Sequence, residues 1–532
     1  MNETGKKPLV GIAISLVAIV IIVAVTLLNQ NRHRSGQSAS QADTLTIGFD
    51  EPPRSADPRL IGSDANSQYL EELRFLPLVS FNEDGSLKYL IAESVTPKDD
   101  TTYVVKIRKG LKFANGDYVT PHDVVSTYEQ ILFPPGNFPP SPRKGAFSSV
   151  SAIMKTAPDE VTFALKAPDA AFPTNLVIGI LPEKAAGAPP ESLDGQGFES
   201  GPYVLSDKTD SLWALKRNDA FDGSAIGIPK PKISNVKFLI IRDETTRYAA
   251  LIRGDIDILQ NGLDADKIVS LKNNSEFQIQ TRTRMSTDYI GFSTQKTPLK
   301  DPTVRLAIAH GINRDEILKF TLQNLAVKAS GMFPKEFEWA TDIPYIEYDP
   351  EKAKQLLDQA NLPIHPGQKF RFNFTIKVTT NKTRIAIAKA IAAQLAAIGI
   401  GVEVESLEFG VFMDQLKEGA VSAWVASWTG YKDPDHLHFV FHSAMRPPEG
   451  GNRGSYSNSI VDDLLANGKM QPDKEKRKPI YQTAQEILAS ELPYVYLWHP
   501  YSIAVSKKEI VGFKTFSDGR YLSLPEVSRG NP

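Results

Sequence analysis

Residues 370–409 read FRFNFTIKVTTNKTRIAIAKAIAAQLAAIGIGVEVESLEF and decide the fold class of the chain. From Phe370 to Val378, apolar side chains alternate with polar ones, which is the period of a half-buried strand. Residues 381–399 are rich in Ala and Leu, which predicts a helix, and Gly399 suits the left-handed position after its end. Residues 400–409 return to a strand pattern. Strand, helix and strand in this order predict a βαβ unit with parallel strands and a right-handed crossover, and therefore an α/β architecture.

Local signals elsewhere agree with this architecture. TLTIGF, residues 44–49, alternates as a strand and marks the start of the folded region. YDPEKAKQLLDQANL predicts a helix that begins after Asp349, with Pro350 in its first turn and Ala353, Leu356, Leu357 and Ala360 on one apolar stripe. FPPGNFPPSP, residues 133–142, carries five prolines and is predicted to be a surface loop.

Composition excludes several classes of protein. The chain has 532 residues, of which 41% are hydrophobic, so two or three packed units are expected. Its net charge of -2 provides no broad basic field, so no nucleic-acid partner is expected. The absence of cysteine excludes a disulfide, a thiolate zinc site, a cysteine nucleophile and a lipid-modified cysteine.

The N-terminus carries an apolar run, LVGIAISLVAIVIIVAVTLL, that is twenty residues long from Leu9 to Leu28 and contains no charge. This length matches a helix across a hydrocarbon core of about 30 Å. We predict a short cytoplasmic segment at 1–8, a transmembrane signal anchor at 9–28 and a flexible linker at 29–43. The alternative is a cleaved signal peptide, but the first small-x-small site, Ser38–Ser40, lies beyond a charged stretch.

Sequence fingerprints of catalysis are missing. No GxSxG, HExxH, GxxxxGK[ST] or GxGxxG pattern occurs in the chain. The one cluster typical of metal ligands is His436, His438 and His442. On a helix, His438 and His442 share a face but His436 does not. The alternative to a metal site is a helix whose histidines meet solvent or a domain edge, with three side chains packed inward: Leu437, Val440 and Phe441.

Seven segments together resemble the family 5 extracellular solute-binding proteins of ABC importers, the group of dipeptide-, oligopeptide- and nickel-binding proteins. The likeness extends from about Thr44 to about Leu524. The segments follow the order of the family: TYVVKIRKGLKFANGDYVTPHDVVSTYE (102–129), GPYVL (201–205) with LKRNDAFDG (215–223), LIRGDIDI (251–258), LKDPTVRLAIAHGINRDEIL (299–318), YDPEKAKQLL (348–357), YSNSIVDDLL (456–465) and KRKPIYQTAQEILASELPYVYLW (476–498).

This resemblance implies a two-lobed periplasmic-binding-protein type II fold of the large, three-domain variety, behind the N-terminal transmembrane helix. It implies a discontinuous lobe I at 44–82, 195–285 and 505–532, an inserted small domain at 83–194, and lobe II at 286–504. Two chain crossovers would act as the hinge. It also implies a monomeric extracytoplasmic receptor that binds a peptide or peptide-like solute and passes it to a permease and its ATPase, with no cofactor and no catalysis.

AWVASWTGYKDPDHLHFVFHS, residues 423–443, begins as a strand, and the resemblance implies that the loop after this strand lines the ligand cleft, as it does in the family. Open α/β sheets also bind ligands at the carboxyl ends of strands. We expect Trp424, inside the strand, to be a core residue, and Trp428, near its exit, to face the cleft, although both could be core. The predicted ligand-binding residues are Glu51, Trp428, Thr429, Gly430, Tyr431 and Asp433.

Two of these assignments leave alternatives open. Peptide-binding relatives carry an Asp shortly after the Trp that holds the peptide ammonium, whereas this chain has Tyr431 there and Asp433 two places on. Either Asp433 takes over that role, or the ligand lacks a free amino terminus. Glu51 matches a cleft-facing loop of the family, but it could equally be a solvated carboxylate. At the level of function, a nickel- or metal-chelate-binding protein and a sensor without a transport role share the same motifs.

Overall fold

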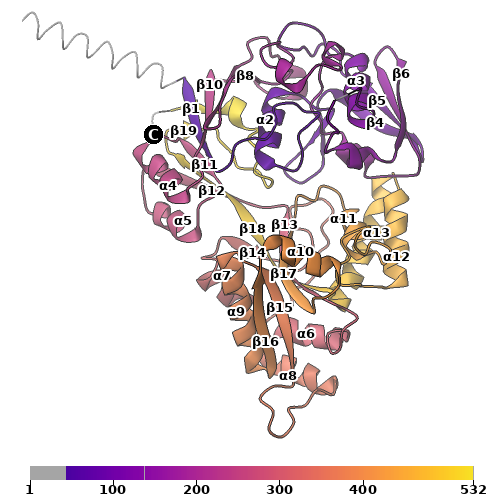
Figure 1. Cartoon of the computed structure of the whole chain (residues 1–532), viewed down its shortest axis with the longest axis vertical. Helices are drawn as coiled ribbons and strands as arrows, with labels where there is room; N and C mark the ends of the chain where they lie inside the picture. The colour runs from indigo at the N-terminus through magenta and orange to yellow at the C-terminus, as the bar shows by residue number, and fades with distance from the viewer. Residues whose placement is uncertain (1–42, 137, 531–532) are drawn as a thin grey trace, which may run out of the picture.

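Strand β18 (Tyr494–Lys507) runs through the middle of the molecule (Figure 1) and joins the two ends of one large sheet. The computed structural model describes residues 43–136 and 138–530. The first half of β18 pairs with β13 (Ser286–Phe292) and its second half with β12 (Phe277–Thr283), both antiparallel. We call residues 43–283 and 501–530 the upper part and residues 286–499 the lower part, as they lie in Figure 1. The chain therefore passes between the two parts along two adjacent strands.

The upper part contains one end of the large sheet. Its strand order is β18, β11, β1, β10, β9 and β8, with β1 parallel to both β10 and β11. The elements of this region are β1 (Thr44–Phe49), α2 (Ala65–Arg74), β8 (Tyr203–Lys208), β9 (Leu212–Arg217), β10 (Asn235–Ile240), α4 (Glu244–Arg253), β11 (Ile258–Gln260), α5 (Ala265–Lys272), β19 (Ile510–Val511) and β20 (Ser528–Arg529). The expected first strand, residues 44–49, is confirmed as β1.

A second, smaller sheet in the upper part has the order β4, β5, β7 and β6, all antiparallel, and packs its own core against α3. The elements of this region are β2 (Val79–Phe81), β3 (Leu87–Tyr89), β4 (Ala92–Asp99), β5 (Thr102–Ile107), α3 (Pro121–Leu132), β6 (Val150–Ala157) and β7 (Glu160–Leu165). The upper part also contains short 3-10 turns at Lys144–Phe147, Phe172–Asn175, Glu183–Ala185, Pro190–Ser192, Ser224–Ile226 and Leu524–Glu526.

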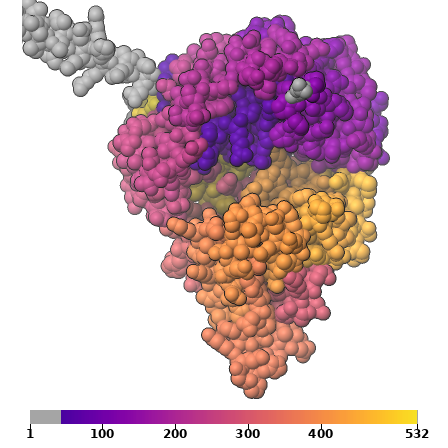
Figure 2. Space-filling model, viewed as in Figure 1, coloured from indigo at the N-terminus to yellow at the C-terminus, as the bar shows by residue number. Residues whose placement is uncertain are grey.

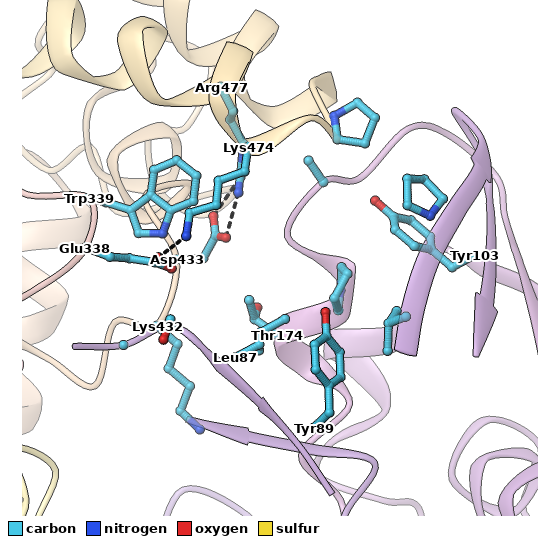
Figure 3. Close-up of a pocket in the computed structure, with 17 residues that line it drawn as sticks. Leu87, Tyr89, Tyr103, Thr174, Glu338, Trp339, Lys432, Asp433, Lys474 and Arg477 are labelled. Atoms are coloured by element: carbon cyan, nitrogen blue, oxygen red, sulfur yellow. Dashed lines mark hydrogen bonds and ion pairs between the residues drawn. The ribbon is translucent and has the colours of Figure 1, made fainter. Parts of the chain in front are cut away.

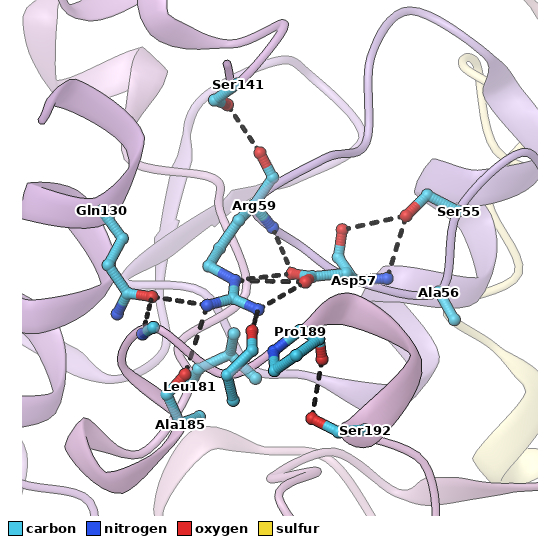
Figure 4. A network of polar contacts seen from close by, with 12 residues as sticks. Ser55, Ala56, Asp57, Arg59, Gln130, Ser141, Leu181, Ala185, Pro189 and Ser192 are labelled. Atoms are coloured by element: carbon cyan, nitrogen blue, oxygen red, sulfur yellow. Dashed lines mark hydrogen bonds and ion pairs between the residues drawn. The ribbon is translucent and has the colours of Figure 1, made fainter. Parts of the chain in front are cut away.

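The guanidinium of Arg59 ties the loop after β1 to this smaller sheet region (Figure 4). Arg59 is wholly buried and donates to Asp57 at 2.6 Å, to Gln130 of α3 at 2.5 Å and to the carbonyl oxygen of Ala188 at 3.0 Å. A buried charge is tolerated only when its donors are satisfied, so this network fixes the loop that leads into α2.

The lower part contains the other end of the large sheet, in the order β16, β15, β17, β13 and β18, with β14 also paired to β18. Its elements are β13, α6 (Pro302–His310), α7 (Arg314–Phe320), β14 (Ala326–Lys328), α8 (Pro350–Gln359), β15 (Phe372–Thr379), α9 (Lys382–Ala397), β16 (Ile400–Leu407), α10 (Phe409–Lys417), β17 (Ala423–Thr429), α11 (His436–Phe441), α12 (Ser459–Met470) and α13 (Lys474–Glu491).

The βαβ unit predicted from residues 370–409 is confirmed. β15 and β16 are parallel neighbours, and α9 connects them after Asn381, whose side chain accepts from the backbone of Arg384. Gly399 adopts the left-handed conformation with φ 86°. The helix after Asp349 is also confirmed as α8, with Ala353 and Leu357 fully buried. The α/β fold class therefore follows from local periodicity.

Trp424 is a core residue, as expected. It is 0% exposed, and its indole lies across Gly291 of β13, where an added methyl group would come within 2.3 Å of the ring. The ring also packs edge-on against Tyr494 of β18. Glycine at position 291 therefore provides the space that lets a tryptophan lie inside the sheet packing.

The predicted anchor at 9–28 and most of the predicted linker lie outside the described residues. In residues 43–136 and 138–530, no helix combines the length and apolar character that a bilayer crossing requires.

We predict that Trp424→Ala lowers the free energy of unfolding of the lower part by about 3–5 kcal/mol, because it leaves a cavity over Gly291. Urea unfolding monitored by circular dichroism measures this. The control is Phe320→Ala, because Phe320 is 71% exposed and should change stability little. A loss below about 1 kcal/mol in Trp424→Ala would contradict the packing described here.

Candidate functional site

A hollow separates the upper part from the lower part, and two adjoining cavities lie in it (Figure 2). The first has a volume of about 290 Å³ and the second about 400 Å³. Both cavities draw residues from both parts, and they share Thr174 of the upper part and Lys432 of the lower part. Cavities of this size between two chain regions are the usual sites of small ligands.

The first cavity is walled by aromatic, hydroxyl and charged side chains (Figure 3). The upper part contributes residues of β3, β4 and β5 and the turn at 172–175, and the lower part contributes residues 338–339, the loop after β17 and the start of α13. The labelled residues are Leu87, Tyr89, Tyr103, Thr174, Glu338, Trp339, Lys432, Asp433, Lys474 and Arg477.

The two parts already touch beside the first cavity. The backbone N–H of Ala170 donates to the carbonyl oxygen of Lys469 at 2.9 Å, and that of Glu338 donates to the carbonyl oxygen of Asp84 at 2.8 Å. Next to Asp84, Gly85 has φ 82° and approaches Phe337 of the lower part so closely that a methyl group there would lie 2.4 Å from the ring. The cavity is therefore bordered by direct contacts between the parts.

Asp433 has an internal partner. Its two carboxylate oxygens accept from the guanidinium of Arg477 on α13, each at 2.7 Å, and the backbone N–H of Asp435 donates to the same carboxylate at 2.8 Å. The side chain of Asp433 is only 11% exposed and that of Arg477 only 4%. Binding a solute ammonium at Asp433 would therefore require this bidentate pair to open.

The neighbouring Lys432 points away from this pair, toward the hairpin of β2 and β3 in the upper part (Figure 3). Its Nζ lies 5.1 Å from the centre of the Phe81 ring. The side chain meets solvent in the cleft, but the protein atoms crowded around it lower the pKa of the ammonium. The negative charge of Glu72 raises the pKa of this ammonium, and the positive charge of Arg520 lowers it further.

Glu72 of α2 lines the second cavity. One of its carboxylate oxygens lies 3.8 Å from Arg520, whereas the other is enclosed by protein without a hydrogen-bond partner. Burial raises the pKa of Glu72 to about 7, although Arg520 acts in the opposite direction. The carboxyl group is therefore partly protonated at neutral pH.

The structure places the other predicted site residues outside the two cavities. Tyr431 is 4% exposed, shares a hydrogen bond with Thr287 through its hydroxyl and packs against Phe333. Trp428 is half-buried, with Arg453 above its ring at 4.5 Å and its indole N–H enclosed without a partner.

Three further predicted residues, Thr429, Gly430 and Glu51, are exposed, and Glu51 pairs with the exposed Arg242 at 3.3 Å. Of the predicted set, only Asp433 lines either cavity. The assignment of the set to the ligand site stays a prediction.

Sequence reasoning overlooked Lys432 and Arg477, although both lie in quoted segments. Lys432 lies in YKDPD next to Asp433, a predicted ligand-binding residue, and this position in the sequence could have indicated that Lys432 also lines the cleft. The upper wall, with Tyr89, Tyr103 and Thr174, had no signal because these residues become neighbours of the loop only in the folded chain.

The three histidines do not form a metal site in the part of the chain that the structure describes, where no group of His, Asp and Glu side chains is arranged to hold a metal ion. Helix α11 buries Leu437, Val440 and Phe441 as predicted. We expected the histidines to meet solvent or a domain edge; His438 meets little solvent, since it is 8% exposed, and burial lowers its pKa to about 4. His436 packs against Trp428.

The chain is similar to bacterial solute-binding proteins along most of its length. Residues 86–444 match the model of the middle region of bacterial extracellular solute-binding proteins, family 5. The dipeptide-binding protein of Escherichia coli K12 is 25% identical over 539 aligned residues, which cover 96% of each chain. The oligopeptide-binding protein AppA of Bacillus subtilis, solved with a nonapeptide, shares 25% identity with a TM-score of 0.67, covering 92% of this chain and 99% of AppA. HbpA2 of Haemophilus parasuis shares the fold at a TM-score of 0.80 and 24% identity, covering 92% and 100%.

We predict that Asp433→Ala lowers the free energy of unfolding by about 3 kcal/mol or more, because the Arg477 guanidinium is left buried without its counter-ion. The control is Asp219→Ala, which breaks an exposed pair with Arg217 and should cost at most about 1 kcal/mol. Equal urea midpoints for the two variants would show that the Asp433 pair does not contribute to stability.

Proposed function

The chain belongs to the bacterial extracellular solute-binding proteins of family 5, and we propose that it is the receptor of an importer for peptide or peptide-like solutes. The solute binds in the two cavities between the upper and lower parts and is released to a permease whose ATPase is a separate chain. The receptor itself carries out no reaction and works as a monomer on the extracytoplasmic side.

The observation that carries this proposal is the pair of adjoining cavities with walls from both parts. Only two adjacent strand passages, β12 to β13 and the middle of β18, connect the parts, so rotation about them changes the width of the cleft. A ligand that contacts both walls stabilises the closed arrangement, and differential affinity for the two arrangements is what a receptor needs to signal its loaded state.

We also propose the division of the chain into lobes that the family resemblance implies, and the passage from β12 to β13 supports its boundary at 285/286. Lobe I comprises 44–82, 195–285 and 505–532, an inserted small domain comprises 83–194, and lobe II comprises 286–504. The small four-stranded sheet, whose core is built mostly from residues 90–180, supports the separate treatment of the inserted domain.

We predict that Thr174→Trp weakens peptide binding by at least on the order of tenfold, because an indole at the junction of the two cavities occupies the space a solute needs. Isothermal titration with mixed-sequence tripeptides measures the loss. The control is Thr156→Trp on β6, an exposed position at the far edge of the small sheet. Equal affinities of the two variants would locate the ligand elsewhere.

We further propose that residues 9–28 remain attached and tether the receptor to the cytoplasmic membrane, as the uncharged run of twenty residues indicates. The full chain should then sediment with membranes in high salt, whereas a chain without residues 1–40 should stay in the supernatant. A mature protein that begins near Gln41 and is recovered in the soluble fraction would refute the tether.

A further inference from the structure

The charged groups in the wall of the first cavity are two ion pairs and one unpaired ammonium. Glu338 pairs with Lys474, and Asp433 pairs with Arg477, so these four charges neutralise one another. Lys432 forms no ion pair with any residue that the structure describes, and its ammonium lies 5.1 Å from the centre of the Phe81 ring. The wall therefore presents a net positive charge at Lys432 (Figure 3).

Lys432 also occupies the point where the two cavities meet, since only Lys432 and Thr174 line both. A solute that extends from one cavity into the other must pass this ammonium. The ammonium of Lys432 donates no hydrogen bond to any residue that the structure describes, and one ring contact does not occupy all three of its N–H groups, so donors remain for a ligand.

The charges around Lys432 do not supply a fixed counter-ion. Asp518 forms an ion pair with Arg520, and Glu71 accepts two hydrogen bonds from Arg143. Glu72 is the remaining acid, but one of its oxygens lies 3.8 Å from Arg520, the other is enclosed by protein, and it forms no ion pair with Lys432 in the described structure. A crowded cation without a counter-ion gains more from an incoming anion than a paired one does.

The same cleft offers little to a solute ammonium. Both oxygens of Asp433 are bound to Arg477, and the free oxygen of Glu72 is enclosed by protein atoms. Tyr431, the residue before Lys432, turns its hydroxyl into the core toward Thr287. The loop after β17 therefore presents a cation, not an anion, to the cleft.

We propose that Lys432 binds a carboxylate of the solute, so that the cleft takes a peptide-like solute by an anionic end and does not require a free amino terminus. This inference rests on the proposed function, and it adds a ligand-binding residue and a substrate class to it.

The test uses the full chain, purified in detergent, and mixed-sequence tripeptides in three forms: free at both ends, acetylated at the amino end, and amidated at the carboxyl end. We expect the free and acetylated forms to bind with similar affinity and the amidated form to bind at least on the order of tenfold more weakly, as loss of a charge-assisted contact predicts.

Two variants separate the role of the ammonium from a general change in the cleft. Lys432→Gln should lower the affinity for the free and acetylated forms by the same factor and leave the affinity for the amidated form unchanged. Lys432→Arg should retain most of the affinity for the free and acetylated forms. Lys508→Gln, an exposed lysine outside both cavities, is the matched control. Urea midpoints should be the same for all three variants, because Lys432 makes no ion pair.

The outcomes distinguish the two proposals. Tight binding of the amidated form together with loss of the acetylated form would show that an ammonium is recognised and would overturn the inference alone. Equal binding of all three forms that is insensitive to Lys432→Gln would overturn it as well. No binding of any tripeptide form would overturn the proposed peptide function, and the inference with it.

Discussion

The antiparallel pairing of β18 with β12 and β13 is the constraint on which the rest of the structure depends. One strand of 14 residues supplies backbone hydrogen bonds to both halves of the large sheet. Because hydrogen-bonded strands resist stretching, the two parts cannot separate, and because the passage has only two adjacent chains, they can still rotate. The walls of both cavities come from the upper and lower parts, so the strand pairing that joins the parts also sets how the walls face one another.

Regular elements could be predicted from the sequence because their signals are local. The alternation from Phe370 to Val378 and the cap at Asn381 act within a few residues, so β15 and α9 form where periodicity places them. The burial of Trp424 was also predictable, because a large aromatic side chain within an apolar strand is usually buried in the core.

The site was harder to predict because its contacts are distant in sequence. Arg477 reaches Asp433 across 44 positions, and nothing in the loop itself indicates that its carboxylate will be neutralised. Tyr431 and Lys432 are neighbours, yet one turns into the core and the other into the cleft, and packing against Phe333 and Phe337 decides which. Local propensity contains no information about such choices.

Gly85 shows how a single missing side chain can set a distance between two bodies. Its Cα faces the ring of Phe337 across the boundary between the upper and lower parts, with no room for even a methyl group. Any larger residue would act as a spacer and hold the cleft wider, independently of the ligand. This contact, together with the backbone hydrogen bonds of Ala170 and Glu338 across the same boundary, limits how far the cleft can narrow and therefore how small a solute can contact both walls at once.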